Sequence, residues 1–99
     1  MNIAGGLSVD LKVDIKVADD ILIDLCAKNQ SQVEAHAKAS YEMFKPISYR
    51  TQNDNGTKYI TKIQVGTNEY IHATILEARD GGHSTVTHVE VNVTLEATY

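Results

Sequence analysis

One cysteine and four histidines are the side chains of this 99-residue chain that could act as nucleophiles or bind a transition metal. Cys26 and His36 lie ten positions apart on one predicted helix, which is too far for contact. His72, His83 and His88 could approach one another across the last predicted hairpin, but no cysteine or carboxylate completes a metal-ligand spacing. We therefore expect Cys26 to be a small buried apolar residue and these three histidines to lie on the surface.

Motifs of other catalytic classes are also missing from the sequence. It contains no Ser/His/Asp, phosphate-loop or dinucleotide-binding pattern. We expect a protein that is not an enzyme and that needs no metal and no cofactor. Enzyme activity through Cys26 or the histidines is the alternative, which substitution of these residues against any detected turnover would test.

Length, charge and composition limit the class of protein further. With 99 residues, 42% of them hydrophobic and 22% charged, the chain predicts one soluble domain over residues 1–99. The net charge of -4 and the scatter of basic residues from Lys12 to Arg79 argue against a nucleic-acid partner. No apolar run approaches the roughly 18 residues needed to cross a membrane. One cysteine and no N-terminal apolar signal segment predict a cytoplasmic protein.

The most informative segment is residues 49 to 66, where two strand-like runs flank a tight turn. Residues 53 to 56, Asn-Asp-Asn-Gly, favour a hairpin because these residue types tolerate the positive φ angles of such turns. Residues 66 to 68 and 80 to 82 predict two further turns. The strands between these turns are expected at about 41–52, 57–65, 69–78 and 85–95.

One strand and one helix are predicted before these four strands. Residues 7 to 17 alternate between apolar and polar side chains, which is typical of a half-buried strand. Its apolar face has Leu7, Val9, Leu11, Val13, Ile15 and Val17. From about 18 to 39 apolar residues recur at helical spacing, with Asp19 and Asp20 as N-cap and first-turn carboxylates. A break or fraying is expected after Asn29, because the polar run there offers little apolar surface.

Two details concern the later strands. Pro46 lacks the N–H of a regular strand residue, which predicts a bend in the strand that contains it. In the last strand the predicted buried face consists of Val89, Val91, Val93 and Leu95. The whole pattern predicts an α+β fold, an antiparallel sheet of about five strands wrapped around one helix in the order β-α-β-β-β-β.

Three blocks of the sequence resemble the stefins, the intracellular (type 1) branch of the cystatins. Residues 3 to 8, Ile-Ala-Gly-Gly-Leu-Ser, are similar to the stefin opening Ile-Pro-Gly-Gly-Leu-Ser. Residues 49 to 57 share the Tyr-x-Thr-Gln and the Gly-Thr that enclose the first stefin hairpin loop. Residues 65 to 72 resemble the exit of one stefin strand and the aromatic-aliphatic-His entry into the next. The resemblance implies a cystatin-like fold and an inhibitor of papain-like cysteine peptidases.

In that family, inhibition makes and breaks no bond. A wedge formed by the N-terminal glycine segment and two hairpin loops enters the peptidase cleft. Carried over by position, the peptidase-binding residues would be Gly5, Gly6, Gln52, Asn53, Asp54, Asn55, Gly56, Arg79 and Asp80.

The loops of this chain depart from the family pattern. Stefins have Val-Val-Ala where this chain has residues 53 to 55, and Leu-Pro near Arg79 and Asp80. Each buried valine that is lost removes roughly 1.5 to 3 kcal/mol of binding free energy. Residues 8 to 52 also form a longer and more regular segment than in stefins. We therefore expect inhibition to be weakened or retargeted, with a non-inhibitory binding protein or an engineered scaffold as the alternative.

The same loop bears on self-association. Stefin-like chains can exchange their first strand-helix-strand unit when the first hairpin straightens. Asn55-Gly56 should instead hold the turn closed, which predicts a monomer, with a domain-swapped dimer as the alternative.

Overall fold

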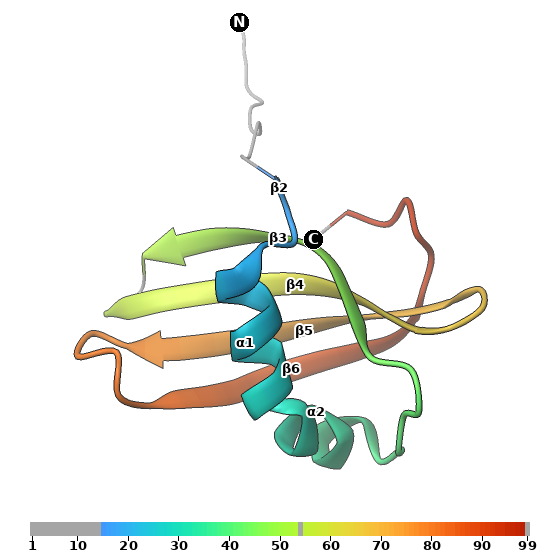
Figure 1. The fold of residues 1–99 in the computed structure, drawn as a ribbon, viewed down its shortest axis with the longest axis horizontal. Coiled ribbons are helices and arrows are strands. Elements are labelled where there is room, and N and C mark those ends of the chain that lie inside the picture. The colour runs from blue at the N-terminus through green and yellow to red at the C-terminus, as the bar shows by residue number, and fades with distance from the viewer. Residues whose placement is uncertain (1–14, 54, 99) are drawn as a thin grey trace, which may run out of the picture.

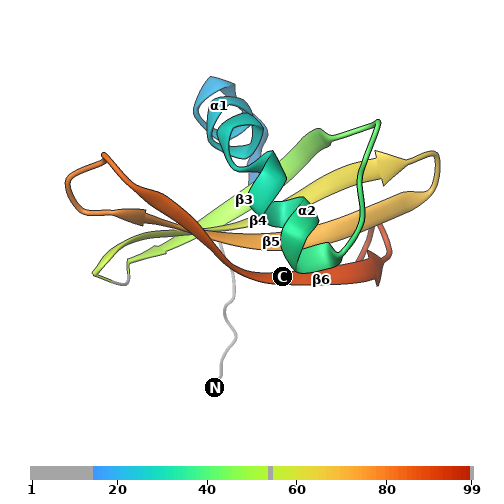
Figure 2. The same cartoon turned by 90° about the horizontal axis from the view of Figure 1, so that it is seen from below.

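The computed structural model describes residues 15–53 and 55–98, which form an antiparallel sheet with two helices on one of its faces (Figures 1 and 2). Its strands lie side by side in their order along the chain. Their bounds are β2 Lys16–Val17, β3 Lys45–Asn53, β4 Gly56–Gly66, β5 Glu69–Ala78 and β6 Ser84–Val93. The predicted α+β fold, with its five strands and its order of elements, is confirmed.

The helical segment is divided into α1 (Asp20–Lys28) and α2 (Gln30–Ala37), with the expected break at Asn29. The carboxylate of Asp19 caps α1, because its Oδ1 accepts a hydrogen bond from the Leu22 N–H at 3.0 Å. Tyr49 also donates its hydroxyl to Asp19 at 2.8 Å, which fixes the start of α1 over β3. The two hydrogen bonds lower the pKa of the Asp19 carboxyl.

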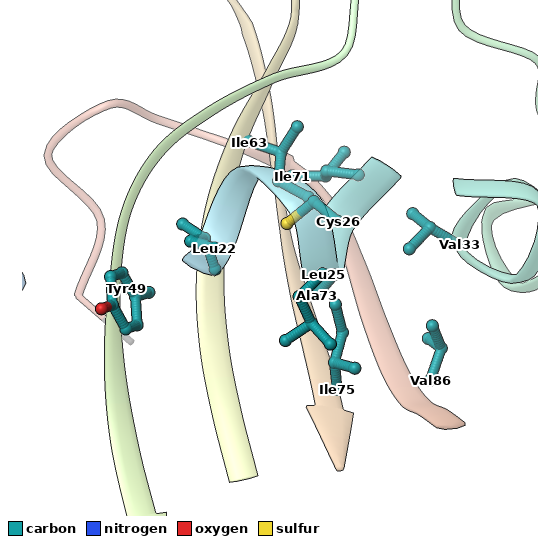
Figure 3. Packing of buried hydrophobic residues seen from close by; sticks show 10 residues of the cluster. All are labelled: Leu22, Leu25, Cys26, Val33, Tyr49, Ile63, Ile71, Ala73, Ile75 and Val86. Atoms are coloured by element: carbon teal, nitrogen blue, oxygen red, sulfur yellow. The ribbon is translucent and has the colours of Figure 1, made fainter. Parts of the chain in front are cut away.

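Ten buried apolar residues form a core between the helices and the sheet (Figure 3). They are Leu22, Leu25 and Cys26 of α1, Val33 of α2, Tyr49 of β3, Ile63 of β4, Ile71, Ala73 and Ile75 of β5, and Val86 of β6. Cys26 is fully buried, as predicted, and burial raises the pKa of its thiol to about 12. Among the described residues, no helix is long and apolar enough to span a membrane.

The strand predicted from residue 41 begins four residues later, at Lys45. The backbone N–H of Tyr41 donates to the side chain of Glu34 at 3.0 Å, so this part of the chain bonds to α2 and not to a neighbouring strand. The bend predicted at Pro46 is confirmed, because the register between β3 and β4 shifts between Pro46 and Ser48.

The predicted strand over residues 7 to 17 lies outside the described residues except at its end. There β2 pairs with β3 at the edge of the sheet, Lys16 opposite Tyr49. The prediction that Ile15 and Val17 belong to a buried face is wrong, since their side chains are 54% and 81% exposed. Lys16, which lies between them, is opposite the buried Tyr49, so Ile15 and Val17 are on the other side of the strand from this core residue.

The buried face predicted for the last strand is also partly wrong. Val91 and Leu95 are exposed, Val89 and Val93 are half-buried, and the buried residue of β6 is Val86. The pairing of β5 with β6 shifts register twice, between Tyr70 and His72 and between Thr74 and Ile75. Each bulge changes which side chains face the helices, and a strict alternation from the sequence cannot follow it.

His72 is buried and not on the surface as predicted, with an exposed fraction of 5%. It lies on the sheet face opposite the helices, since its neighbours Ile71 and Ala73 both belong to the core. Lys62, its partner in β4, is 3% exposed. Residues 94–98, called the C-terminal cover below, cross this face. The Lys62 ammonium donates to the backbone carbonyl oxygens of two cover residues, Leu95 and Ala97.

Candidate functional site

The two hairpin turns that the sequence singles out lie at the same end of the sheet (Figure 1). The β3–β4 turn and the β5–β6 turn become neighbours because Gly56, at the start of β4, pairs with Ala78, at the end of β5. A hollow of about 370 Å³ between them is lined by Asn53, Asn55, Gly56, Thr57 and Arg79. The structure therefore brings together the described candidate residues, which we call the hairpin edge: Gln52, Asn53, Asn55, Gly56, Arg79 and Asp80.

The first turn of the hairpin edge has a backbone that only a few residue types can adopt. Asn53 pairs with Thr57, and Asn55 takes the left-handed conformation at φ 58°. Gly56 follows with φ 146°, and a Cβ atom there would collide with the backbone carbonyl oxygen of Glu77. Glycine at this position thus allows β5 to approach the turn closely.

The second turn is held by backbone hydrogen bonds and one side chain. The Ala78 N–H donates to the His83 carbonyl at 2.8 Å, and the Gly81 N–H donates to the Ala78 carbonyl at 2.9 Å. Oδ1 of Asp80 accepts from the Gly82 N–H at 2.8 Å, a local bond typical of aspartate in turns. The Arg79 and Asp80 side chains are exposed. The predicted turn over residues 80 to 82 is confirmed.

A buried hydrogen-bond network, which sequence reasoning did not predict, joins the helix break to the start of β6, next to the second turn. Asn29, 1% exposed, donates through Nδ2 to the Leu25 carbonyl and to Ser84 Oγ, both at 2.9 Å. Gln32 donates to Asn29 Oδ1 at 3.0 Å, and its own Oε1 accepts from the Val86 N–H at 3.1 Å. The helix break thereby fixes the first residues of β6. The sequence signal for this network is the polar Asn29 at helical spacing with the apolar Leu22, Leu25, Cys26 and Val33.

The chemistry available at the hairpin edge is hydrogen bonding by amides and by one charge of each sign. Gln52, Asn53, Asn55 and Asp80 are exposed and polar, and Arg79 adds a guanidinium. Among residues 15–53 and 55–98, no group of three or more His, Cys, Asp or Glu side chains could hold a metal ion. Gly5, Gly6 and Asp54 lie outside the described residues, so their place relative to this edge stays a prediction.

Comparison with characterised proteins identifies the family. The chain is 33% identical over 75 residues to cystatin-A8 of Sus scrofa, an alignment that covers 76% of this chain and 68% of that protein. It is 32% identical over 76 residues to leukocyte cysteine proteinase inhibitor 1 of Sus scrofa, covering 77% and 69% of the two chains. Human cystatin-A matches at 29% over 79 residues, 80% of this chain and 76% of the relative.

The chain belongs to the stefin family. No protein-family model matches it. Gln52, which matches the glutamine of the stefin loop, is exposed, and Gly56 is the glycine that the close approach of β5 requires.

Proposed function

We propose that this stefin inhibits papain-like cysteine peptidases by pressing the hairpin edge into the active-site cleft without forming a covalent bond. The observation that carries the proposal is the convergence of the two turns, fixed by the Gly56–Ala78 pair. The printed name of a relative, leukocyte cysteine proteinase inhibitor 1, gives that relative this class of activity. The cytoplasm is the proposed compartment.

The N-terminal glycines and the two turns each have a physical role in this proposal. Gly5 and Gly6 would allow close approach of the N-terminal backbone to the cleft. Gln52 to Gly56 would fill the space near the catalytic thiol of the peptidase. Arg79 and Asp80 would contact the cleft wall, where their exposed charges favour a polar surface.

The polar side chains of the edge predict weak or redirected inhibition. Asn53 and Asn55 offer less apolar area than the valine and alanine of the family loop, and their amides must be desolvated on binding. A loss of about 3 kcal/mol corresponds to a dissociation constant larger by roughly two orders of magnitude. A peptidase with hydrogen-bonding groups in its cleft would recover part of that loss.

An inhibition titration against a panel of active-site-titrated papain-like peptidases tests the proposal. We expect inhibition in the micromolar range for at least one peptidase. A triple variant, Asn53→Val, Asp54→Val and Asn55→Ala, should tighten inhibition by about 100-fold. Thr67→Val with Asn68→Val, in the exposed turn at the other end of the sheet, is the matched control and should leave inhibition unchanged.

The polarity of the edge also favours a second candidate, a non-inhibitory binding protein or engineered scaffold that uses the same loops for another partner. It predicts no inhibition by the unchanged chain at high micromolar concentration, with inhibition gained by the triple variant. If neither the unchanged chain nor the triple variant inhibits any peptidase, the proposal that the hairpin edge binds peptidases is refuted.

We further propose that the protein is a monomer. Asn55 occupies the left-handed conformation that closes the first turn, and asparagine tolerates this conformation better than most residues. Size-exclusion chromatography with light scattering should give the mass of one chain. A stable dimer with an extended β3–β4 segment would contradict the proposal and indicate strand exchange.

A further inference from the structure

A groove of about 330 Å³ lies between α1 and the sheet, outside the hairpin edge. Leu25, which is buried, and Tyr59, which is half-buried, line it together with Ile21, whose side chain is 64% exposed. Asp20 and Asp24 line it from the helix. Glu77 and Lys28 complete the lining of this α1 groove. It therefore combines an apolar floor with a rim of three carboxylates and one ammonium.

The α1 groove faces the end of the sheet where the hairpin edge lies. Asp20, Asp24 and Lys28 are spaced by four residues along the chain, so they share one face of the helix. On the sheet, Glu77 pairs with Thr57, the residue next to Gly56. A protein bound to the hairpin edge would thus come close to the groove without rearrangement of the described residues.

The electrostatic character of the groove is negative. The Tyr59 hydroxyl donates to Oε1 of Glu77 at 3.4 Å, which leaves the other carboxylate oxygen of Glu77 available to a further donor. Burial, and then the negative charge of Glu77, raises the pKa of the Tyr59 hydroxyl. Asp20 and Asp24 are exposed on the helix side of the groove. A cationic group entering here would meet unlike charge on both walls.

We propose that the α1 groove is a second contact surface, which takes an apolar side chain flanked by lysine or arginine from the surface of the bound peptidase. This inference rests on the proposed inhibition. Charge selects the occupant: a second copy of this chain carries a net charge of -4 and would be repelled, whereas a basic surface would be attracted. The groove would then favour peptidases that are basic beside their cleft, which matters most where the polar loops bind weakly.

Neutralising the rim tests the proposal on the intact protein. Asp24→Asn with Glu77→Gln removes two charges and keeps an acceptor for the Tyr59 hydroxyl. For the peptidases that are inhibited and basic, the inhibition constant should rise by about fivefold at low salt and lose most of its salt dependence. The control, Glu42→Gln with Glu69→Gln, removes two exposed charges that lie away from the groove. It should change the inhibition constant by less than twofold. Asp24→Asn alone, on an exposed helix position, is the variant to use if the double variant folds poorly.

A direct probe separates this inference from the proposed function. Acetyl-Arg-Leu-Lys-amide, titrated at millimolar concentration, should shift the amide NMR signals of Asp24, Tyr59 and Glu77, and the double variant should lose these shifts. If the peptide binds but no peptidase is inhibited, the groove is supported as a basic-peptide site and the proposed inhibition fails. If inhibition persists, the rim variant behaves like its control and the peptide shifts none of these signals, the groove proposal is overturned and the proposed function stands.

Discussion

The hairpin edge and the C-terminal cover place polar side chains in opposite surroundings. At the edge Gln52, Asn53 and Asn55 are exposed, and the backbone of the two turns holds them in place. Under the cover Lys62 and His72 are 3% and 5% exposed, and the Lys62 ammonium bonds to carbonyl oxygens of the chain itself. One end of the sheet thus exposes its polar groups, whereas on one face polar groups bond to other residues of the same chain.

The difference teaches which polar residues are available for binding. Exposed amides on a hydrogen-bonded turn require little ordering of the backbone when they bind, so they suit recognition. Buried charges must be compensated where they lie, and removing their partner is costly. Substitution of the exposed Gln52 or Asn53 should therefore affect binding, whereas substitution of the buried Lys62 or His72 should affect stability.

The largest expected effect distinguishes Gly56 of the first hairpin turn from Gly81 of the second, both of which have a positive φ. Gly56→Ala should lower the free energy of unfolding by about 3 kcal/mol, because the new methyl group collides with the Glu77 backbone in a strained conformation. Gly81→Ala, where no atom lies within 4 Å of the added Cβ, should cost only about 1 kcal/mol. Urea unfolding measures both. Equal effects would show that φ alone, and not the approach of β5, demands glycine at residue 56.

The next largest effect concerns the C-terminal cover. Lys62→Met keeps an unbranched side chain, one atom shorter, but removes the donor to the Leu95 and Ala97 carbonyls. It should lower the free energy of unfolding by about 1.5 kcal/mol. Hydrogen exchange at the Ala97 N–H, which donates to the Thr94 carbonyl at 3.1 Å, should become faster. Lys45→Met, at an exposed position, is the control. Unchanged exchange would mean that the cover is held by its apolar contacts.

The sequence predicts those parts of the fold that depend on neighbouring residues. The cap at Asp19 and the turn chemistry around Asn55 are local, and both appear in the structure. The break at Asn29 is also local, because the polar residues after it weaken the apolar stripe. The two hairpin turns of the candidate site could be found in this way, and the order of the strands then brings them together.

Other parts depend on contacts between distant residues and could not be read from the pattern. His72 is buried because the chain returns across its face more than twenty residues later. Asn29 bonds to Ser84, 55 residues away. One bulge of the β5–β6 pairing, between Thr74 and Ile75, reverses the side of Val86 relative to the alternation that runs through Val89. The acidic rim of the α1 groove likewise joins helix and sheet residues that no local motif connects.

A smaller effect tests how rigid the first turn is. Asn55→Ala should lower the free energy of unfolding by about 1 kcal/mol, because alanine tolerates φ 58° less well than asparagine. Asn55→Gly should leave stability nearly unchanged, since glycine adopts this conformation freely. Thermal unfolding of both variants measures the difference. If both substitutions cost the same, the Asn55 side chain itself stabilises the turn, and the edge is less free to bind a partner than its exposure indicates.

The smallest effect concerns the pH dependence of the covered face. Burial, and then the charge of Lys62, lowers the pKa of His72 below its usual 6.5, although Glu90 at 3.8 Å acts in the opposite direction. The unfolded chain therefore binds a proton at a pH where the folded chain does not, so stability is full above pH 6.5 and falls as the pH drops from there toward the folded pKa. His72→Gln should flatten this slope, whereas His36→Gln, at an exposed position, should keep it. Urea unfolding between pH 7.5 and about 5, above the usual carboxyl range, measures the slope, and a slope that persists in His72→Gln would assign it to other groups.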